Sequence, residues 1–502
     1  MLTDLLKLLP LGGLIVITTL LTEWAVRSKK LPYWLSRKIL HIIAVGSCAI
    51  APRLVEDLRG LIVLVMLSLP LLYYLITRRK LMLDENKRPA WGIVWFPVAY
   101  LFLLTHAFFT ETDSVTGPML VLALCDPAAT ITGKLFGSNP YRLTGEPKTL
   151  AGNIGFFLSF LVLTYVVLWL DPIVNGTDVL FRITIIGLIL TATEALGSYG
   201  LDNLFLPLVC LLLGFYSPPQ VPLEAVGLTL ILAVPFYLFF VRRRSLSPGG
   251  AVAAILLGVL VVWFVDWIAL LPLVFFFASS ILIGKLLPHQ TVSDTKDKQP
   301  RDAVQVACNG LAYFLILAGG AIASYGYYRE GLEANFQNFI EASRAQAASI
   351  FSVQLLTAAL ISIAVSTADT WASEVGQYFK QATYDLVRWR KVPPGLSGGV
   401  SLVGSMAALI GAACVGGFAW SFRIPDLFGS TFVSITTFGF LGMLLDSVLG
   451  GLLQRQYYDG QRWRDTPGPL ILSTRGLSWM TNDLVNLVAN LVTVGLYLIW
   501  VN

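Results

Sequence analysis

Two carboxylates stand in apolar stretches of this 502-residue sequence, where the composition favours contact with lipid. Asp126 lies in "LALCDPAATITGKLFG" at 122–137, and Asp369 lies in "VSTADTWASEVGQYFK" at 365–380. A charge inside a bilayer costs at least ~2.5–3.5 kcal/mol on insertion scales, so a carboxylate in such a place is a candidate for function. We therefore treat both residues as candidate catalytic groups and metal ligands.

Further oxygen ligands in the first half favour a Mg²⁺ site, because Mg²⁺ prefers one or two carboxylates with water and substrate phosphates. Lys148 begins "KTLAGN", where small residues let backbone amides approach phosphate oxygens. Carboxylates for a metal beside lysine for phosphates are the groups that phosphoryl transfer uses. The candidates for these roles are Asp126, Glu194, Asp202, Asn203, Lys134 and Lys148.

Structural roles compete with these chemical ones. Asp126 precedes Pro127 and could cap a helix, because proline favours the first helical position. Lys134 is better explained as a charge that sets membrane topology, whereas Glu194 sits at a helix end among small residues and favours function. A GxxxxGK[ST] motif is absent from the sequence, which excludes a P-loop enzyme.

The second half carries a similar inventory. Asp369 and Ser373 share a helix face, with Glu374 adjacent. The stretch "KVPPGLSGGVSLVGS" at 391–405 is a stiff turn that runs into a helix start suited to binding anions through backbone amides. Close helix packing is the alternative there, and it explains Gly404 and Gly411. The candidate phosphate-binding residues of this half are Arg301, Gln305, Asn309, Ser373, Gly395, Ser397, Gly398, Gly399 and Ser401.

Acidic and amide residues near two helix ends predict a second metal site. Asp446 lies in "LLDSVLGG", and "TNDLVN" places Asn482, Asp483 and Asn486 on one turn. Such residues also cap helices, but together with Asp369 they favour a metal. In "RDAVQVACNG", the polar side chains of Arg301, Gln305 and Asn309 follow one stripe that a purely lipid-facing helix would not tolerate.

The elements that position these residues are membrane helices. The chain is 56% hydrophobic and 13% charged, with a mean hydropathy of +0.73, whereas a soluble chain carries nearer a quarter charged residues. The sequence predicts an all-α polytopic integral membrane protein with about 16 transmembrane helices in two tandem, related helical bundles. The expected spans are 11–26, 39–52, 60–77, 92–110, 117–133, 150–170, 180–197, 203–216, 223–241, 249–265, 267–285, 303–325, 348–368, 398–418, 430–451 and 483–501. The five cysteines are scattered and fit neither a disulfide framework nor a zinc site.

Charge in the loops predicts the orientation. Most of the 35 lysines and arginines fall in alternate loops, and positive loops face the cytoplasm. Both chain ends then lie outside, and the polar clusters open near the cytoplasmic ends of their helices. A Pro-rich turn, "YSPPQVP" at 216–222, separates the expected domains 1–216 and 249–502, with a connecting segment at 217–248 that holds a helix and a basic loop.

The first half resembles the phytol kinase and dolichol kinase family, integral membrane enzymes that phosphorylate prenyl alcohols, typically with CTP. The motifs are "SRKILH", "WGIVWFP", "DPAATITGKLFG", "KTLAGN", Glu194 and "LDNLFLP", in order over about 36–207. Cys125, Thr149 and Asn153 depart from the usual residues of that family. The resemblance implies phosphate or nucleotide binding by Arg37, Lys38, His41, Thr149 and Asn153.

The second half resembles a related membrane family whose plant member is phytyl-phosphate kinase. The motifs are "RRRSLSPGGAVAAILLG", "RDAVQVACNG", "ADTWASEVGQ", "VPPGLSGGVSLVGS", "LLDSVLGGLLQ" and "WMTNDLVN", over about 242–487. Together the two resemblances imply a fusion of two consecutive kinases, in a plasma or thylakoid membrane if the source is a photosynthetic bacterium. The first would convert phytol to phytyl phosphate and the second would form the diphosphate, with CTP and Mg²⁺, for tocopherol and phylloquinone synthesis.

Two other functions compete with the kinase reading, and nucleic acid is not an expected partner. A CDP-diacylglycerol synthase would carry a dense acidic run near its end, which this sequence lacks. A secondary transporter would place its polar residues near the bilayer centre, whereas the clusters here are expected at one surface.

Overall fold

The computed structural model describes residues 2–77, 91–170, 177–215, 223–287, 300–334, 347–422, 429–460, 463–465, 467 and 471–501. The chain divides into two compact units, Met1–Ser217 and Pro218–Asn502, which are described separately below. The Pro-rich turn predicted at 216–222 lies outside the described residues, as do most of the basic loops at 77–88 and 296–301.

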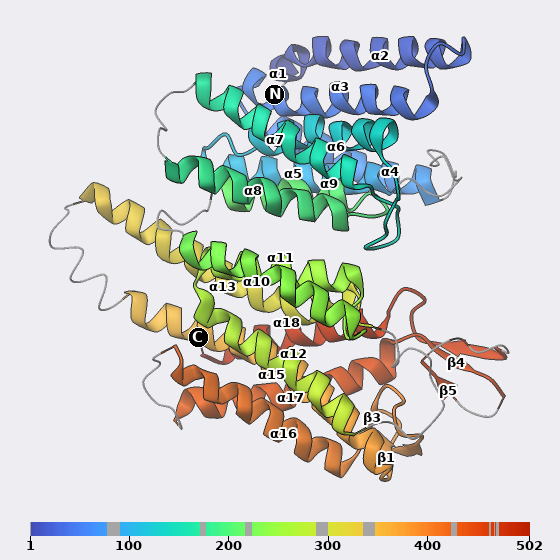
Figure 1. Ribbon diagram of the computed structural model, residues 1–502, viewed down its shortest axis with the longest axis vertical. Coiled ribbons are helices and arrows are strands. Elements are labelled where there is room, and N and C mark those ends of the chain that lie inside the picture. Colours follow the sequence, from blue (N-terminus) through green and yellow to red (C-terminus); the bar gives the residue numbers. More distant parts are fainter. Residues whose placement is uncertain are drawn as a thin grey trace. The chain divides into compact units, whose positions relative to one another are not determined.

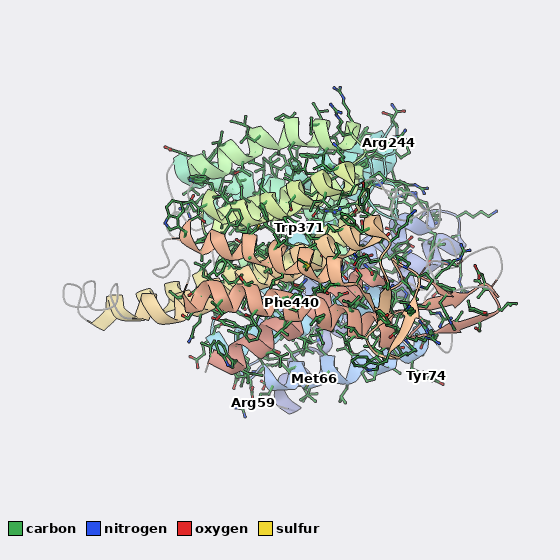
Figure 2. All side chains as sticks on the ribbon, turned by 90° about the horizontal axis from the view of Figure 1, so that it is seen from below. Arg59, Met66, Tyr74, Arg244, Trp371 and Phe440 are labelled. Carbon is green, nitrogen blue, oxygen red and sulfur yellow. The ribbon has the colours of Figure 1, made fainter. Side chains whose placement is uncertain are left out.

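The first unit is a bundle built around helix α6, which packs against α3, α7 and α9 (Figure 1). Apolar side chains such as Met66 and Tyr74 of α4 project outward (Figure 2), as expected where a helix faces lipid. The helices are α1 (Leu2–Lys7), α2 (Leu9–Arg27), α3 (Tyr33–Leu54), α4 (Arg59–Thr77), α5 (Gly92–Thr110), α6 (Thr116–Phe136), α7 (Leu150–Leu170), α8 (Thr177–Leu196) and α9 (Asp202–Phe215).

The second unit is a bundle around helix α15, which contacts α12, α13, α16, α17 and α18. Residues 357–368 of α15 are all buried, and Trp371 follows them among the helices (Figure 2). The elements are α10 (Leu223–Arg242), α11 (Pro248–Phe264), the short 3₁₀ helix Trp267–Ala269, α12 (Leu270–Leu286), α13 (Ala303–Ala334), α15 (Ala347–Phe379), α16 (Leu402–Gly416), the 3₁₀ helix Gly417–Trp420, α17 (Ser430–Leu453) and α18 (Asn482–Val501).

The prediction of a polytopic helical membrane protein is confirmed. Among the described residues, fourteen helices are long and apolar enough to cross a bilayer, and α9 and α11 are shorter apolar helices. A helix satisfies all its backbone hydrogen bonds internally, which lipid cannot do for it. All five cysteines are free, in line with the prediction.

Two small antiparallel sheets, which the sequence analysis did not predict, follow helices of the second unit (Figure 1). One has the order β2-β1-β3 and pairs Asp385 with Arg390; the other has the order β5-β4-β6 and pairs Gln456 with Arg475. Strands of two or three residues are too short to show an alternating pattern. The strands are β1 (Thr383–Asp385), β2 (Arg390–Val392), β3 (Gly399–Val400), β4 (Gln456–Tyr458), β5 (Trp463–Arg464) and β6 (Ser473–Arg475).

Two interpretations of carboxylates as residues at helix ends are wrong. Asp126 is not a helix cap, because α6 runs from Thr116 through Pro127 to Phe136 and keeps Asp126 near its middle. Asp369 is not at a helix end either, since α15 continues ten residues further to Phe379. The apolar run expected at 348–368 ends before α15 does, so hydropathy alone placed Asp369 at a helix end.

Close contacts through small residues hold the second unit together, as expected for Gly404 and Gly411. A Cβ atom at Gly404 would stand 2.8 Å from the Ala372 carbonyl oxygen, and one at Gly411 would stand 3.1 Å from the Trp371 ring. Gly439 of α17 is equally tight, with Ala364 at 2.7 Å and Ala412 at 3.0 Å from its missing Cβ. Without a strong hydrophobic drive in lipid, such close backbone approach stabilises helix association.

We expect Gly439→Val to destabilise the second unit by about 1–3 kcal/mol, because overpacking forces neighbouring helices apart. The measurement is the midpoint of thermal unfolding in detergent. Gly495→Val is the matched control, since a Cβ at Gly495 meets nothing within 4 Å. Equal midpoints for the two variants would contradict the packing role.

Candidate active site

Asp126 is buried near the middle of α6 and is paired with a lysine from α3. Lys38 Nζ lies 2.8 Å from Asp126 Oδ2. His41, one turn further along α3, places Nε2 3.6 Å from the same oxygen and 3.2 Å from the Leu122 carbonyl oxygen. The ion pair explains how the chain tolerates a carboxylate at this depth.

A second lysine–carboxylate pair lies beside the first. Lys148 Nζ lies 2.5 Å from Glu194 Oε1 in the last turn of α8. Two backbone hydrogen bonds with Tyr141 fix the Lys148 loop, and Thr144 Oγ1 donates to the Leu196 carbonyl oxygen. Burial lowers the pKa of Lys148, but the carboxylates of Glu194 and Asp202 outweigh it, so that pKa lies above its usual value. Lys148 therefore remains a cation at neutral pH.

Three carboxylates converge at this place. Ligand atoms of Asp126, Glu194 and Asp202 lie within 4.8 Å of one another. Asp202 stands in the first turn of α9 and accepts a hydrogen bond from the Asn203 backbone, while Asn203 Nδ2 donates to the Gly92 carbonyl oxygen at 3.2 Å. An all-oxygen donor set of this kind fits a hard divalent cation such as Mg²⁺. Asn203 orients the start of α9 on α5.

The other predicted residues of the first unit divide into two groups. Arg37 and Lys134 are exposed and form no ion pair within 4 Å among the described residues. Thr149 caps α7 by accepting the Gly152 amide, and Asn153 Nδ2 donates to the Tyr141 hydroxyl. These two side chains support the Lys148 loop.

The small residues of "TLAGN" have a packing role that the sequence analysis did not recognise. A Cβ atom at Gly152 would stand 2.9 Å from the Ala129 carbonyl oxygen on α6. These residues therefore have a packing role, and the contact of their amides with phosphate stays a prediction. Lys148 reaches the carboxylates because this close contact holds the start of α7 against α6.

In the second unit, two carboxylates lie on the neighbouring helices α15 and α17. Asp369 and Asp446 are close enough to interact electrostatically. The Asn486 side chain of α18 directs its amide nitrogen toward two acceptors. Nδ2 donates to Asp446 Oδ2 at 2.9 Å and to the Asn482 carbonyl oxygen at 3.0 Å. Asp483, also of α18, lies close enough to Cys308 of α13 to act on it electrostatically. Asp369, Asp446 and Asn486 thus form a core, in which the described residues show no lysine paired with a carboxylate.

A buried hydrogen-bonded chain extends this core and was missed from the sequence. Asn490 Nδ2 donates to Ser366 Oγ at 3.1 Å, and Ser366 Oγ donates to the Asn309 carbonyl oxygen at 3.3 Å. The signal was present, because Asn490 follows Asn486 by one turn and Ser366 precedes Asp369 by three residues. The chain joins α18, α15 and α13.

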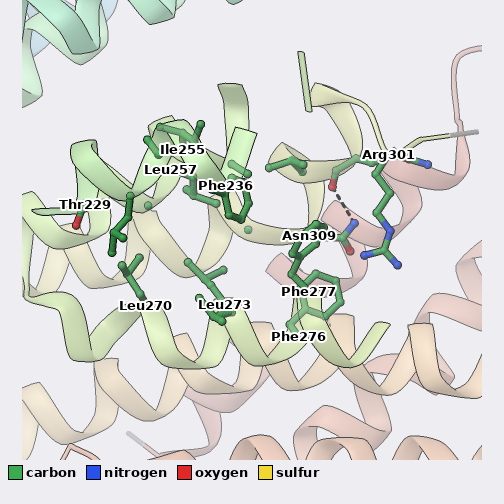
Figure 3. A pocket seen from close by; sticks show the side chains of 18 residues that line it. Thr229, Phe236, Ile255, Leu257, Leu270, Leu273, Phe276, Phe277, Arg301 and Asn309 are labelled. Carbon is green, nitrogen blue, oxygen red and sulfur yellow. Dashed lines mark hydrogen bonds between the residues drawn. The ribbon is translucent and has the colours of Figure 1, made fainter. Parts of the chain in front are cut away.

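Arg301, Gln305 and Asn309 lie at one end of an apolar cavity of about 280 Å³ between α10, α11, α12 and α13 (Figure 3). Apolar side chains such as Phe236 and Leu273 line the rest. Asp302 caps α13 by accepting the Gln305 backbone amide, and Gln305 Oε1 accepts the Asp302 backbone amide in return. The predicted polar stripe therefore faces a cavity with an apolar body and a cationic end.

Glu374 and Ser373 do not enter the Asp369–Asp446 core. Glu374 lies beside Gly284 of α12 and interacts with Arg301. Ser373 is exposed and donates to the Thr370 carbonyl oxygen of its own helix.

The predicted anion-binding loop already holds an anionic group. Ser397 N and Oγ donate to Asp465 Oδ2 at 2.9 and 2.8 Å. Gly395 and Gly398 have φ of +85° and +91°, which favours glycine. The expected helix start at 398 is wrong, since β3 occupies Gly399–Val400 and Ser401 caps α16 by accepting the Gly404 amide. In the structure the Ser397 donors hold a carboxylate of the same chain, and binding of phosphate by this loop stays a prediction.

Comparison with known proteins identifies the second unit. The family model described as "Integral membrane protein DUF92" matches residues 231–494, more than half of the chain. The chain belongs to the DUF92 family. The match begins within α10 and ends within α18, so all the candidate residues of the second unit lie inside the DUF92 region.

Two relatives align with this DUF92 protein over long segments. Protein PGR of Arabidopsis thaliana is 27% identical over 271 residues, which cover 50% of this chain and 88% of the relative. An uncharacterized membrane protein of Methanocaldococcus jannaschii is 24% identical over 217 residues, which cover 43% of this chain and 77% of the relative. No solved structure matches the chain.

We expect Glu194→Gln to increase the reactivity of Lys148 toward an amine-acylating reagent at pH 8.5. Loss of the facing carboxylate lowers the raised pKa, so more Lys148 is the neutral, nucleophilic amine, by about tenfold for each unit. Mass spectrometry of the labelled peptides gives the rate, and the exposed Lys134 is the internal reference. An unchanged ratio of the two rates would show that Glu194 does not hold Lys148.

Proposed function

We propose that this protein is a membrane lipid kinase. Its first unit would phosphorylate a prenyl alcohol such as phytol, and its second unit would add another phosphate to the product. The donor would be a nucleoside triphosphate with Mg²⁺, and the resemblances favour CTP. The observation that carries the proposal is the group of Asp126, Glu194 and Asp202, with Lys38 and Lys148 paired against it.

The geometry suits phosphoryl transfer to a hydroxyl. Bound Mg²⁺ would neutralise phosphate charge and hold the donor for attack. Asp126 and Asp202 are the residues to hold it, and Lys148 would turn from Glu194 to a phosphate oxygen. The prenyl hydroxyl then attacks the γ-phosphorus, the bond to the bridging oxygen breaks, and the released Glu194 carboxylate accepts the hydroxyl proton.

The second unit offers places for a lipid that is already an anion. A prenyl tail leaves water with ~0.8 kcal/mol per buried CH₂, which the apolar cavity of α10–α13 would accept. The cationic Arg301 at the end of that cavity suits a phosphate head. Asp369 and Asp446, with Asn486, would hold the metal that offsets repulsion between acceptor and donor. Both sites would open to the cytoplasm, where nucleotides are available.

The deciding experiment incubates the purified protein with CTP, Mg²⁺ and phytol and separates labelled products by thin-layer chromatography. Monophosphate followed by diphosphate supports the proposal. A CDP-linked lipid would instead identify a cytidylyltransferase. Absence of any nucleotide turnover with phytol, farnesol and geranylgeraniol, in protein that keeps its helical signal, would leave the transporter reading.

We expect Asp126→Asn to abolish formation of the monophosphate, because it removes a metal ligand and leaves Lys38 without its partner. Conversion of supplied phytyl phosphate should continue, since the second unit has its own carboxylates. Asp113→Asn, at an exposed pair with Arg53, is the matched control and should leave both steps intact. Loss of both activities in folded Asp126→Asn protein would contradict independent sites.

We expect Asp369→Asn to yield a protein that accumulates phytyl phosphate and forms little diphosphate. The removed charge is one of the two that would hold the metal against an anionic acceptor. A time course of labelled products checks this, with the exposed Glu224→Gln as control. Diphosphate formed at the wild-type rate would mean that the second reaction uses other residues.

A further inference from the structure

The two small sheets of the second unit carry arginines, of which only some are balanced by nearby acids. Arg388 is fully engaged, because Nη1 lies 3.0 Å from Asp385 Oδ2 and donates to the Gly451 carbonyl oxygen at 2.9 Å. Arg390 of β2 is exposed and forms no ion pair within 4 Å among the described residues. Arg475 of β6 likewise has no carboxylate within 4 Å in the described part of the chain.

A chain of hydrogen bonds fixes Arg475 beside the Ser397 loop. Arg475 Nε donates to Gln456 Oε1 at 2.6 Å, and Gln456 Nε2 donates to Asp465 Oδ1 at 2.9 Å and to the Ser397 carbonyl oxygen at 3.1 Å. The Arg475 guanidinium also stacks over the Trp463 ring, 4.4 Å from its centroid. Arg475 Nη2 is buried and lacks a hydrogen-bond partner among the described residues. A buried donor without a partner is costly, so this nitrogen is suited to receive a ligand oxygen.

The surrounding charge favours an anion. Burial and the nearby charges of Arg388 and Arg390 lower the pKa of Arg475, against the opposing effect of Asp385 and Asp465. The guanidinium groups of Arg388, Arg390 and Arg475 therefore outnumber the two carboxylates that act on this place. One of these carboxylates, that of Asp385, is already paired with Arg388. Ser397 N and Oγ donate to the Asp465 carboxylate, which demonstrates that these loop donors can bind an anionic oxygen.

The loop also lies next to the carboxylate core of the unit. A Cβ at Gly398 would stand 2.7 Å from Gly451 Cα and 3.3 Å from the Ser447 carbonyl oxygen on α17. Ser447 follows Asp446 directly on that helix. The Gly398 part of the loop is therefore close to the α17 backbone beside Asp446.

We propose that Arg390, Arg475 and the Ser397 loop form a binding site for the phosphate chain of a nucleoside triphosphate, with Asp465 occupying the Ser397 donors until phosphate replaces it. The assignment of the ligand as the phosphate donor rests on the proposed kinase function. Arginine suits this role because its planar donors bind phosphate oxygens in pairs.

The test measures binding of inorganic tripolyphosphate to the purified full-length protein in neutral detergent at low salt, by calorimetry and without any lipid acceptor. Arg390→Gln should weaken binding about tenfold or more, the effect of one charge-assisted hydrogen bond. Asp465→Asn should tighten it, because the competing carboxylate loses its charge. Arg243→Gln, which removes an exposed arginine at the end of α10, is the control and should leave affinity unchanged.

Weaker tripolyphosphate binding in Arg390→Gln together with tighter binding in Asp465→Asn supports the site. If Asp465 had only a structural role, Asp465→Asn would weaken or abolish that binding. Unchanged affinity in both variants would overturn the proposal. It would also fail if only phosphatidylglycerol micelles, and not tripolyphosphate, bound in an Arg390-dependent manner. If tripolyphosphate binds but no prenyl alcohol is phosphorylated, the kinase function is refuted and the phosphate site is kept. If the Arg390→Gln protein turns over substrate with an unaltered nucleotide KM, the phosphate site is refuted and the kinase function is kept.

Discussion

The cost of placing a carboxylate among membrane helices governs the arrangement of both units. In the first unit, each deep carboxylate is met by a cation, Lys38 for Asp126 and Lys148 for Glu194. Each pair joins elements that are distant in sequence, so the pairs set which helices must be neighbours. Breaking one partner leaves an uncompensated buried charge, which is far more costly than the intact pair is stabilising.

The second unit meets the same cost with amides and hydroxyls. Asn486 donates to Asp446, and Asn490 and Ser366 continue the chain toward α13. Among the residues that the structure describes, neither Asp369 nor Asp446 has a lysine or arginine within 4 Å. The two units therefore differ in local charge, the first close to neutral and the second acidic at its core, with arginines on the sheets beyond it. Such a difference suits a neutral acceptor in one unit and a charged one in the other.

The sequence was informative where burial and residue type conflict. Asp126, Glu194, Asp202 and Lys148 could be singled out because charged residues in apolar surroundings need a reason, and the structure brings them together. The helical membrane architecture followed from the apolar runs for the same physical reason.

Contacts across long separations could not be predicted in that way. Lys38 and Asp126 are 88 residues apart, and Ser397 and Asp465 are 68 apart. Nothing in the local pattern marks Asp465 as the partner of the glycine loop. Asp465 directly follows strand β5, and the strands of both sheets are too short to leave a periodic signal. Some helices also extend past the apolar runs that were used to locate them.

The central position of α15 has a consequence for how the protein is made. Helix α15 carries Ser366 and Asp369, yet α16, α17 and α18, which cover it and supply Asp446 and Asn490, follow it in the chain. During synthesis from the N-terminus, this helix therefore leaves the ribosome before Asp446 and Asn490 have been made, although Asn309 of α13 is already present. Either it is retained beside the insertion machinery until α18 is complete, or it enters lipid with an exposed acid. Assembly of the second unit thus depends on α18. A ribosome that stalls before α18 would leave a polar helix in the bilayer as a substrate for membrane quality control.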